Sequence, residues 1–334
     1  MGATMLDYGS AIRQGFEYLL NKYPECFIMG QGLWSPWYVG NTMTDLDTKF
    51  GKSRVIDTPV SESGITGLGV GAAIAGLKPI IVHPRMDFML YGMDAIVNEA
   101  AKWHSMTGGK ASAGVTIRAI INRGGEQGAQ HSQALHAWFM HIPGIRVVMP
   151  YSVKDARDLL ISSVLSPDPV LYIDDRWLYS NEAELSEICE YDLNQIKPQI
   201  ISAGNDFTIV AAGYSVQLAI QVNEIIKAQD FSGDIFDLRV LNPLDLSEIV
   251  QSVSRTGRLI VIDGGWGPAS LSSEVIAGVV EKIDLNYLTN PPARFTLPFA
   301  PAPSGRTLEE AYYPKANKIA KDILEQIENK RKAK

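Results

Sequence analysis

The chain has 334 residues, of which 46% are hydrophobic and 20% charged, and its formal net charge is −7. This composition indicates a globular protein long enough for two domains, and the acidic balance excludes the nucleic-acid-binding class, which needs a basic surface. No uncharged apolar run approaches the roughly 18–20 residues of a spanning helix, and no apolar leader opens the chain, so we expect a cytoplasmic protein without a membrane contact.

The first half of the chain alternates helical and strand-like segments. The strands are short apolar runs bounded by proline or glycine, and the helices carry apolar residues on one face. Continuous apolar strands that alternate with helices indicate a parallel sheet covered on both faces. We expect helices at residues 5–21, 64–76, 93–106 and 154–164, and strands at residues 26–30, 54–57, 79–82, 115–121, 146–149 and 170–173.

The second half repeats this alternation after an acidic, irregular stretch at residues 180–199, which we interpret as a linker. The fold class is therefore α/β, with two doubly wound domains at residues 1–185 and 200–334. Residues 291–306 are rich in proline, which predicts an ordered surface loop. We expect strands at residues 207–212, 235–238 and 258–262, and helices at residues 215–228, 246–254, 270–283 and 313–327.

The stretch at residues 57–80 joins a strand end, a tight loop and a glycine-rich helix. A purely structural interpretation is open: Ser61 would be the N-cap, and Glu62 in the first turn would complement the helix dipole. The glycines, among them Gly67 and Gly71, would then only let helices approach closely. A functional role for Glu62 is the alternative.

A nucleotide fingerprint competes for the same stretch. Residues 67–72 match G-x-G-x-x-A, and Asp87 lies at the distance expected for a ribose ligand. The fingerprint needs its first glycine at the end of the strand, whereas Gly67 lies inside the helix. The context therefore disfavours NAD binding.

All five histidines fall in the first domain, and three of them are spaced five residues apart, which does not stack side chains on one helical face. This spacing disfavours a zinc site, and we assign no metal ligand to this chain. His131 follows a glycine-rich loop in a polar segment, where histidines serve a site or simply face solvent. The histidines are His83, His104, His131, His136 and His141.

Asp174 and Asp175 form an adjacent acidic pair at a strand end. Neighbouring side chains on a strand point apart, so a shared cation is disfavoured. We interpret the pair as part of a solvated loop.

Six longer motifs carry a resemblance to a known family. In their residues and their order, they resemble motifs of the β subunits of the decarboxylating component of 2-oxoacid dehydrogenase complexes. That family includes the pyruvate, branched-chain and acetoin enzymes. The resemblance covers essentially the whole chain. The motifs are residues 54–80 (RVIDTPVSESGITGLGVGAAIAGLKPI), 100–109 (AAKWHSMTGG), 128–160 (GAQHSQALHAWFMHIPGIRVVMPYSVKDARDLL), 168–179 (DPVLYIDDRWLY), 238–245 (LRVLNPLD) and 258–275 (RLIVIDGGWGPASLSSEV).

The resemblance implies a pyrimidine-binding, transketolase-like domain at residues 1–185 and a transketolase C-terminal-like domain at residues 200–334. It also implies thiamine diphosphate, which acts as an electron sink in these enzymes. Glu62 matches the glutamate that hydrogen-bonds the pyrimidine nitrogen N1′. Phe88 matches an aromatic residue that packs on the pyrimidine, and His131 matches a histidine where substrate and the lipoyl acceptor arrive.

The chain departs from the family around this site. Pro84 and Tyr91 stand where relatives carry a methionine and a glutamine near the pyrimidine, and we count both as cofactor-binding positions. Residues 30–32 read Gly-Gln-Gly where relatives have an acidic residue. Three activities therefore stay open: acyl transfer from a 2-oxoacid to lipoamide, carboligation or ketol transfer to an aldehyde or sugar, and a non-catalytic scaffold.

The diphosphate end of the cofactor has no matching motif. In thiamine enzymes Mg²⁺ is held by a Gly-Asp-Gly motif and a later asparagine, and neither Gly233-Asp234 nor Asp263-Gly264 completes one. We therefore expect the Mg²⁺ ligands to come from an α-type partner subunit. The resemblance implies a heterotetramer of two α and two β subunits, with a lipoyl acyltransferase as a further candidate partner.

Overall fold

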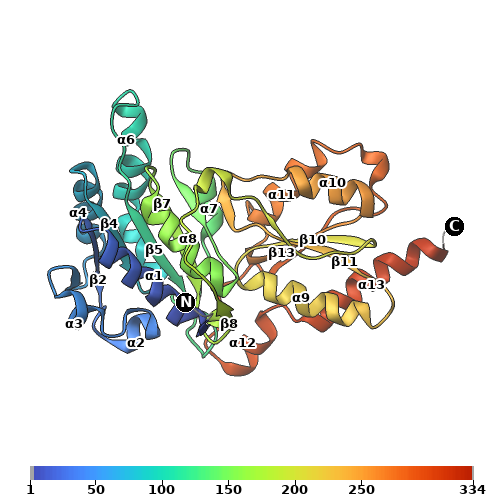
Figure 1. The fold of residues 1–334 in the computed structure, drawn as a ribbon. Coiled ribbons are helices and arrows are strands. Elements are labelled where there is room, and N and C mark those ends of the chain that lie inside the picture. The colour runs from blue at the N-terminus through green and yellow to red at the C-terminus, as the bar shows by residue number, and fades with distance from the viewer. Residues whose placement is uncertain (1–3, 333–334) are drawn as a thin grey trace. The chain divides into compact units, whose positions relative to one another are not determined.

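The computed structural model describes residues 4–332, and the chain divides into two compact units (Figure 1). The first unit comprises Met1–Arg123 and Gln130–Ile196, and the second comprises Gly124–Ala129 and Lys197–Lys334. The short segment Gly124–Ala129 thus belongs with the second unit although the chain on both sides of it belongs with the first. The sequence analysis did not predict that this segment belongs with the second unit.

The first unit contains a parallel sheet with the strand order β6-β7-β5-β4-β2-β3. The apolar runs that predicted these strands are confirmed; β5 and β7 are fully buried, whereas β3 at the edge of the sheet buries only Val55. The strands are β2 (Cys26–Gln31), β3 (Val55–Thr58), β4 (Lys78–His83), β5 (Thr116–Ile121), β6 (Arg146–Val148) and β7 (Val170–Asp175).

Helices cover both faces of this sheet. On one face, α4 packs so closely that a Cβ atom on Gly69 would lie 2.4 Å from Ile81 of β4. On the other face, Tyr172 of β7 donates a hydrogen bond to the Ala156 carbonyl of α8 at 2.7 Å, and α1 packs against α8. The helices are α1 (Tyr8–Lys22), α2 (Pro36–Val39), α3 (Leu46–Phe50), α4 (Glu62–Ile74), α5 (Met86–Met89), α6 (Ala101–Met106), α7 (His136–Met140) and α8 (Val153–Leu165).

The N-terminal helix begins later than predicted. Residues Thr4–Asp7 form the strand β1, which pairs antiparallel with β8 (Glu182–Leu185) inside the stretch predicted to be an irregular linker. Asp7 then caps α1 by accepting a hydrogen bond from the Ser10 amide at 2.6 Å. The predicted start at residue 5 and the absence of structure at residues 182–185 were therefore wrong.

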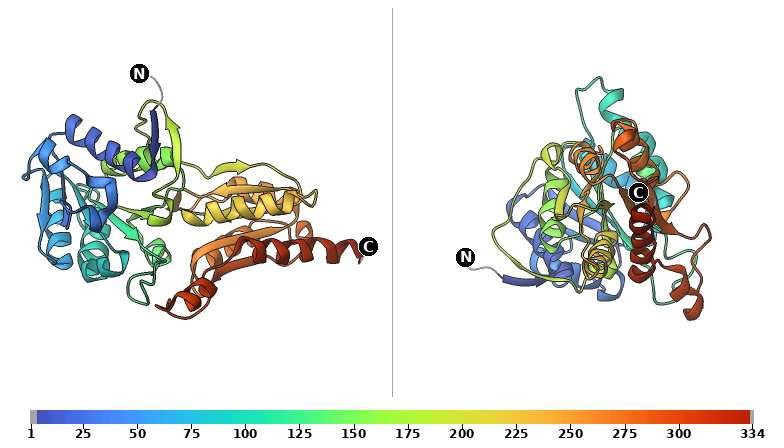
Figure 2. Two further views of the ribbon diagram at one scale, coloured as in Figure 1. Left: turned by 90° about the horizontal axis from the view of Figure 1, so that it is seen from below. Right: turned by 90° about the vertical axis from the view of Figure 1, so that its right-hand side faces the viewer.

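The second unit contains a sheet with the strand order β14-β13-β10-β11-β9, in which only β9 is antiparallel to its neighbour among the described residues. Helices α9 and α13 lie side by side along this unit (Figure 2). The strands of this sheet are β9 (Gln199–Ser202), β10 (Phe207–Ala211), β11 (Gly233–Asp237), β13 (Leu259–Trp266) and β14 (Ala293–Leu297), and the short strand β12 (Val240–Asn242) is not part of it. The helices are α9 (Tyr214–Lys227), α10 (Ser247–Thr256), α11 (Leu271–Val280), α12 (Arg306–Tyr312) and α13 (Ala316–Lys332).

The proline-rich stretch at residues 291–306 is not only a loop. It contains the edge strand β14, and α12 begins at its last residue. Its prolines flank the strand and leave the ladder intact, as edge strands permit. The predicted α/β class with two sheet-containing domains is confirmed, and no helix within residues 4–332 combines the length and apolar character needed to cross a membrane.

Candidate active site

Glu62 begins helix α4, directly beyond the carboxyl end of β3, and its side chain is 9% exposed. Its predicted place in the first helical turn is confirmed. Ser61 occupies the N-cap position, but its side chain accepts no capping hydrogen bond. The predicted N-cap position of Ser61 is therefore confirmed, and only the side-chain capping hydrogen bond is missing.

The structure brings Phe88 and His131 together. Phe88 lies in α5 and His131 in the loop that follows β5, and their rings meet edge to face with centroids 5.1 Å apart and planes at 84°. Both side chains are partly exposed. The contact forms one aromatic edge at the carboxyl end of the sheet, where parallel α/β sheets bind ligands.

Asp87 ties α5 to the loop that carries His131. Its Oδ1 atom accepts hydrogen bonds from the backbone amide of Gln133 at 3.1 Å and from Gln133 Nε2 at 2.9 Å. Its Oδ2 atom is buried and has no hydrogen-bond partner among the described residues. Burial raises the pKa of Asp87, and the Gln133 bonds and the nearby His131 oppose that rise.

Sequence reasoning considered Asp87 only as a ribose ligand and missed this role. The signal was present in the polar run around His131, because Gln133 belongs to the same motif. No spacing rule could pair it with a residue 46 positions earlier.

Pro84 and Tyr91 flank the Phe88 segment. Pro84 follows the end of β4 and is buried, whereas Tyr91 lies in the 3-10 turn η2 (Leu90–Gly92) and is 72% exposed. Helix α4 packs against both α5 and η2. The helix that carries Glu62 therefore lies against the segment that carries Phe88 and Tyr91, and the cofactor contacts of these residues remain predictions.

Asp174 and Asp175 are not in a solvated loop, so that prediction was wrong. Both end β7 in full burial, and each is paired with an arginine. Arg118 binds the two Asp174 oxygens at 2.9 and 2.8 Å, and Arg123 lies 2.7 Å from Asp175. The two side chains do point apart, as expected on a strand, but an arginine meets each of them.

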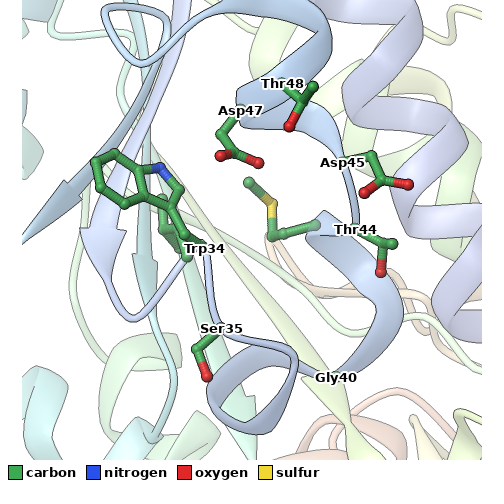
Figure 3. A pocket seen from close by; sticks show the side chains of 9 residues that line it. Trp34, Ser35, Gly40, Thr44, Asp45, Asp47 and Thr48 are labelled. Carbon is green, nitrogen blue, oxygen red and sulfur yellow. The ribbon is translucent and has the colours of Figure 1, made fainter.

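A cavity of about 350 Å³ lies in the segment after β2, where the Leu33 amide donates to Asp57 at 3.1 Å. Figure 3 shows Trp34 and Asp47 facing one another across it. Glu62, Phe88 and His131 are not among its lining residues. Within residues 4–332, no group of three or more His, Cys, Asp or Glu side chains is placed to hold a metal ion.

Comparisons with known proteins place the two units. A family model described as "Transketolase, pyrimidine binding domain" matches residues 4–180, and one described as "Transketolase, C-terminal domain" matches residues 197–319. A solved structure described as a split gene transketolase, inactive β4 tetramer, superposes with a TM-score of 0.75 at 18% identity. It covers 96% of this chain and 98% of that one, and it establishes the fold alone.

Two curated relatives carry the same description, pyruvate dehydrogenase E1 component subunit beta. The one from Rickettsia bellii is 34% identical over 304 residues, which span 91% of this chain and 93% of the relative. The mitochondrial one from Saccharomyces cerevisiae is 36% identical over 319 residues, which span 94% of this chain and 87% of the relative.

Proposed function

This chain belongs to the family of the pyruvate dehydrogenase E1 component β subunits, and we propose that it is the β-type subunit of a two-chain thiamine diphosphate enzyme that decarboxylates a 2-oxoacid. One observation supports this most directly. The nearly buried Glu62 begins the helix that packs against the segment carrying Phe88, whose ring meets His131.

The residues fit the pyrimidine half of the cofactor. Glu62 presents a carboxylate in a mostly dry place, which suits a hydrogen bond to the ring nitrogen N1′. The partly exposed ring of Phe88 offers an apolar wall, and Pro84 and Tyr91 lie before and after it in the chain. Thiamine diphosphate, when bound, supplies the electron sink for the decarboxylation.

The acid–base roles then follow from position. Glu62 would hold a proton at the ring nitrogen N1′ of the bound cofactor. His131, whose partly exposed ring meets Phe88, would meet substrate and acceptor. The free Oδ2 atom of Asp87 is a buried acceptor beside this edge, and it would accept a hydrogen bond from a bound donor.

The diphosphate half needs a partner chain. Mg²⁺ requires several oxygen ligands, and no cluster of acidic or histidine side chains within residues 4–332 is placed to supply them. We propose an α-type subunit that carries this half, in a heterotetramer of two α and two β subunits. Large apolar side chains exposed on the first unit fit coverage by a partner: Trp37 84%, Val60 72%, Tyr91 72% and Trp138 53%.

The acceptor has two candidates. Lipoamide on a lipoyl acyltransferase is the first, by analogy with the family. Transfer to an aldehyde or sugar is the second, because Pro84 and Tyr91 stand where relatives carry other residues near the pyrimidine. The substrate is a 2-oxoacid, and pyruvate and the branched-chain acids are the first to be tried.

The decisive experiment uses the purified two-chain complex. It is supplied with thiamine diphosphate, Mg²⁺ and each 2-oxoacid in turn, and reduction of an artificial electron acceptor is measured. We expect turnover with at least one 2-oxoacid. Lipoyl domain and small aldehydes are then compared as acceptors. A complex that turns over none of these substrates would leave the non-catalytic scaffold as the better description.

A further inference from the structure

Thr66 lies where three elements of the first unit meet. It is fully buried one turn after Glu62 in α4. Its Oγ1 atom lies 2.6 Å from the Glu62 carbonyl oxygen and 3.1 Å from Nε2 of His83, the last residue of β4. It also touches Gly92 of η2, because a Cβ atom there would lie 2.6 Å from Oγ1.

The proton positions in this chain of contacts follow from chemistry. A carbonyl oxygen accepts but cannot donate, so the single Thr66 hydroxyl proton must point at Glu62. The Thr66 oxygen can then only accept from His83. His83 Nε2 must therefore carry a proton and donate it, which fixes the imidazole tautomer.

His83 is also held neutral. It is 1% exposed, and burial lowers its pKa to about 4. With the proton on Nε2, Nδ1 is an acceptor, and it has no hydrogen-bond partner among residues 4–332. A buried unsatisfied acceptor is a cost to stability, which a leucine or phenylalanine at this position would not carry.

We propose that His83 is a positioning residue for Glu62, acting through Thr66. This inference rests on the proposed function, because it concerns the geometry of the residue that serves the cofactor. His83 fixes the Thr66 rotamer, and Thr66 binds the carbonyl of Glu62 in the first helical turn. That turn lacks a capping bond from Ser61 to its backbone amides, and the Thr66 hydroxyl restrains it from the carbonyl side by donating to Glu62.

The same contact couples Glu62 to Phe88. Gly92 is pressed against Thr66, and it closes the turn that follows Phe88 in the chain. A shift of Thr66 would therefore displace the carboxylate and the aromatic wall together. Misplacement of a catalytic group by about 1 Å can cost on the order of 100-fold in rate.

Four variants separate the effect of the His83–Thr66 hydrogen bond from the effect of side-chain volume. His83→Leu removes the donor, and Thr66→Val removes the hydroxyl with little change in shape. His83→Gln keeps an amide nitrogen near the position of Nε2 and should rescue. Thr116→Val is the matched control, because Thr116 is equally buried in β5 and its hydroxyl has no partner among the described residues.

The first readout is hydrogen–deuterium exchange at the thiazolium C2 of thiamine diphosphate bound to the two-chain complex. We expect His83→Leu and Thr66→Val each to slow it by roughly 10- to 100-fold. The double variant should be no slower than the slower single variant, since both act through one contact. His83→Gln should stay within about threefold of wild type, and Thr116→Val should match it.

The second readout needs no cofactor. Imidazole ¹⁵N spectra of the full-length chain, assigned with His83→Gln, should show His83 neutral at pH 7 with its proton on Nε2. A proton on Nδ1 would overturn the inference. If His83→Leu fails to fold, the exchange rate of Thr66→Val and this spectrum still test the positioning role of His83.

The role of His83 and the proposed function can be refuted separately. If exchange is slow in Glu62→Gln but as fast as wild type in His83→Leu and Thr66→Val, the role of His83 is overturned and the proposed function stands. Wild-type exchange in Glu62→Gln would overturn the proposed function, and the positioning role with it.

Discussion

The buried pair of Arg118 and Asp174 gives a quantitative prediction for the first unit. Both side chains are 0% exposed. Arg118 donates to both Asp174 oxygens, to Thr42 at 2.9 Å and to Tyr179 at 2.9 Å. Asp174→Asn keeps the shape but leaves a buried guanidinium without its counter-charge, with an amide NH₂ facing its donors. Breaking a buried pair in this way costs about 3–5 kcal/mol.

That cost is a large part of the roughly 5–15 kcal/mol by which a domain is stable. With about 2–4 °C lost per kcal/mol in a unit of this size, the first thermal transition should fall by roughly 6–20 °C. Circular dichroism during heating, together with urea unfolding, measures it. Asp168→Asn is the control, because the Arg146–Asp168 pair is partly exposed, with 13% and 37% of the side chains accessible, and should cost no more than about 1 kcal/mol. Equal losses in the two variants would refute the reasoning.

Three further predictions concern the site. Glu62→Gln should fold normally and keep less than about a tenth of the turnover, since an electrostatic contribution of roughly 3–4 kcal/mol is lost; a more active variant would contradict the assignment. His131→Ala should slow acyl transfer in single-turnover experiments more than it weakens cofactor binding, and the opposite pattern would exclude the role. Because burial lowers the pKa of His83 to about 4, only the unfolded chain takes up this proton as the pH falls from about 6.5 to 4. Stability should therefore drop across that window, and less so in His83→Gln; equal pH profiles would argue against a buried neutral imidazole.

The sequence predicted what depends on local pattern. Apolar runs such as residues 79–82 and 207–212 mark strands because burial on both faces demands them. Glu62 was predicted to lie in a first helical turn because a strand end, a tight loop and a helix follow one another directly in the sequence. The strands β1 and β8 were missed because each spans only four residues, most of which are not buried.

Pairings across the fold could not be predicted in this way. Asp174 looks like a loop residue until Arg118, 56 positions earlier, is brought beside it by the parallel pairing of β5 and β7. Phe88 and His131 were assigned to one site by resemblance, and no spacing rule shows their contact. The Thr66–His83 bond depends on how α4 packs on β4, a tertiary contact that includes the close approach of Gly69 to Ile81.

The measurement that tests the central claim most directly is calorimetric titration of thiamine diphosphate and Mg²⁺. The titration is made into this chain alone, and then into the chain co-expressed with its α-type partner. If the site is split between two chains, the chain alone should bind weakly, with a dissociation constant above about 1 mM or a free energy weaker than roughly −4 kcal/mol. The complex should bind one cofactor per αβ pair at micromolar concentration or below. Micromolar binding by this chain alone, at one cofactor per monomer, would contradict the account.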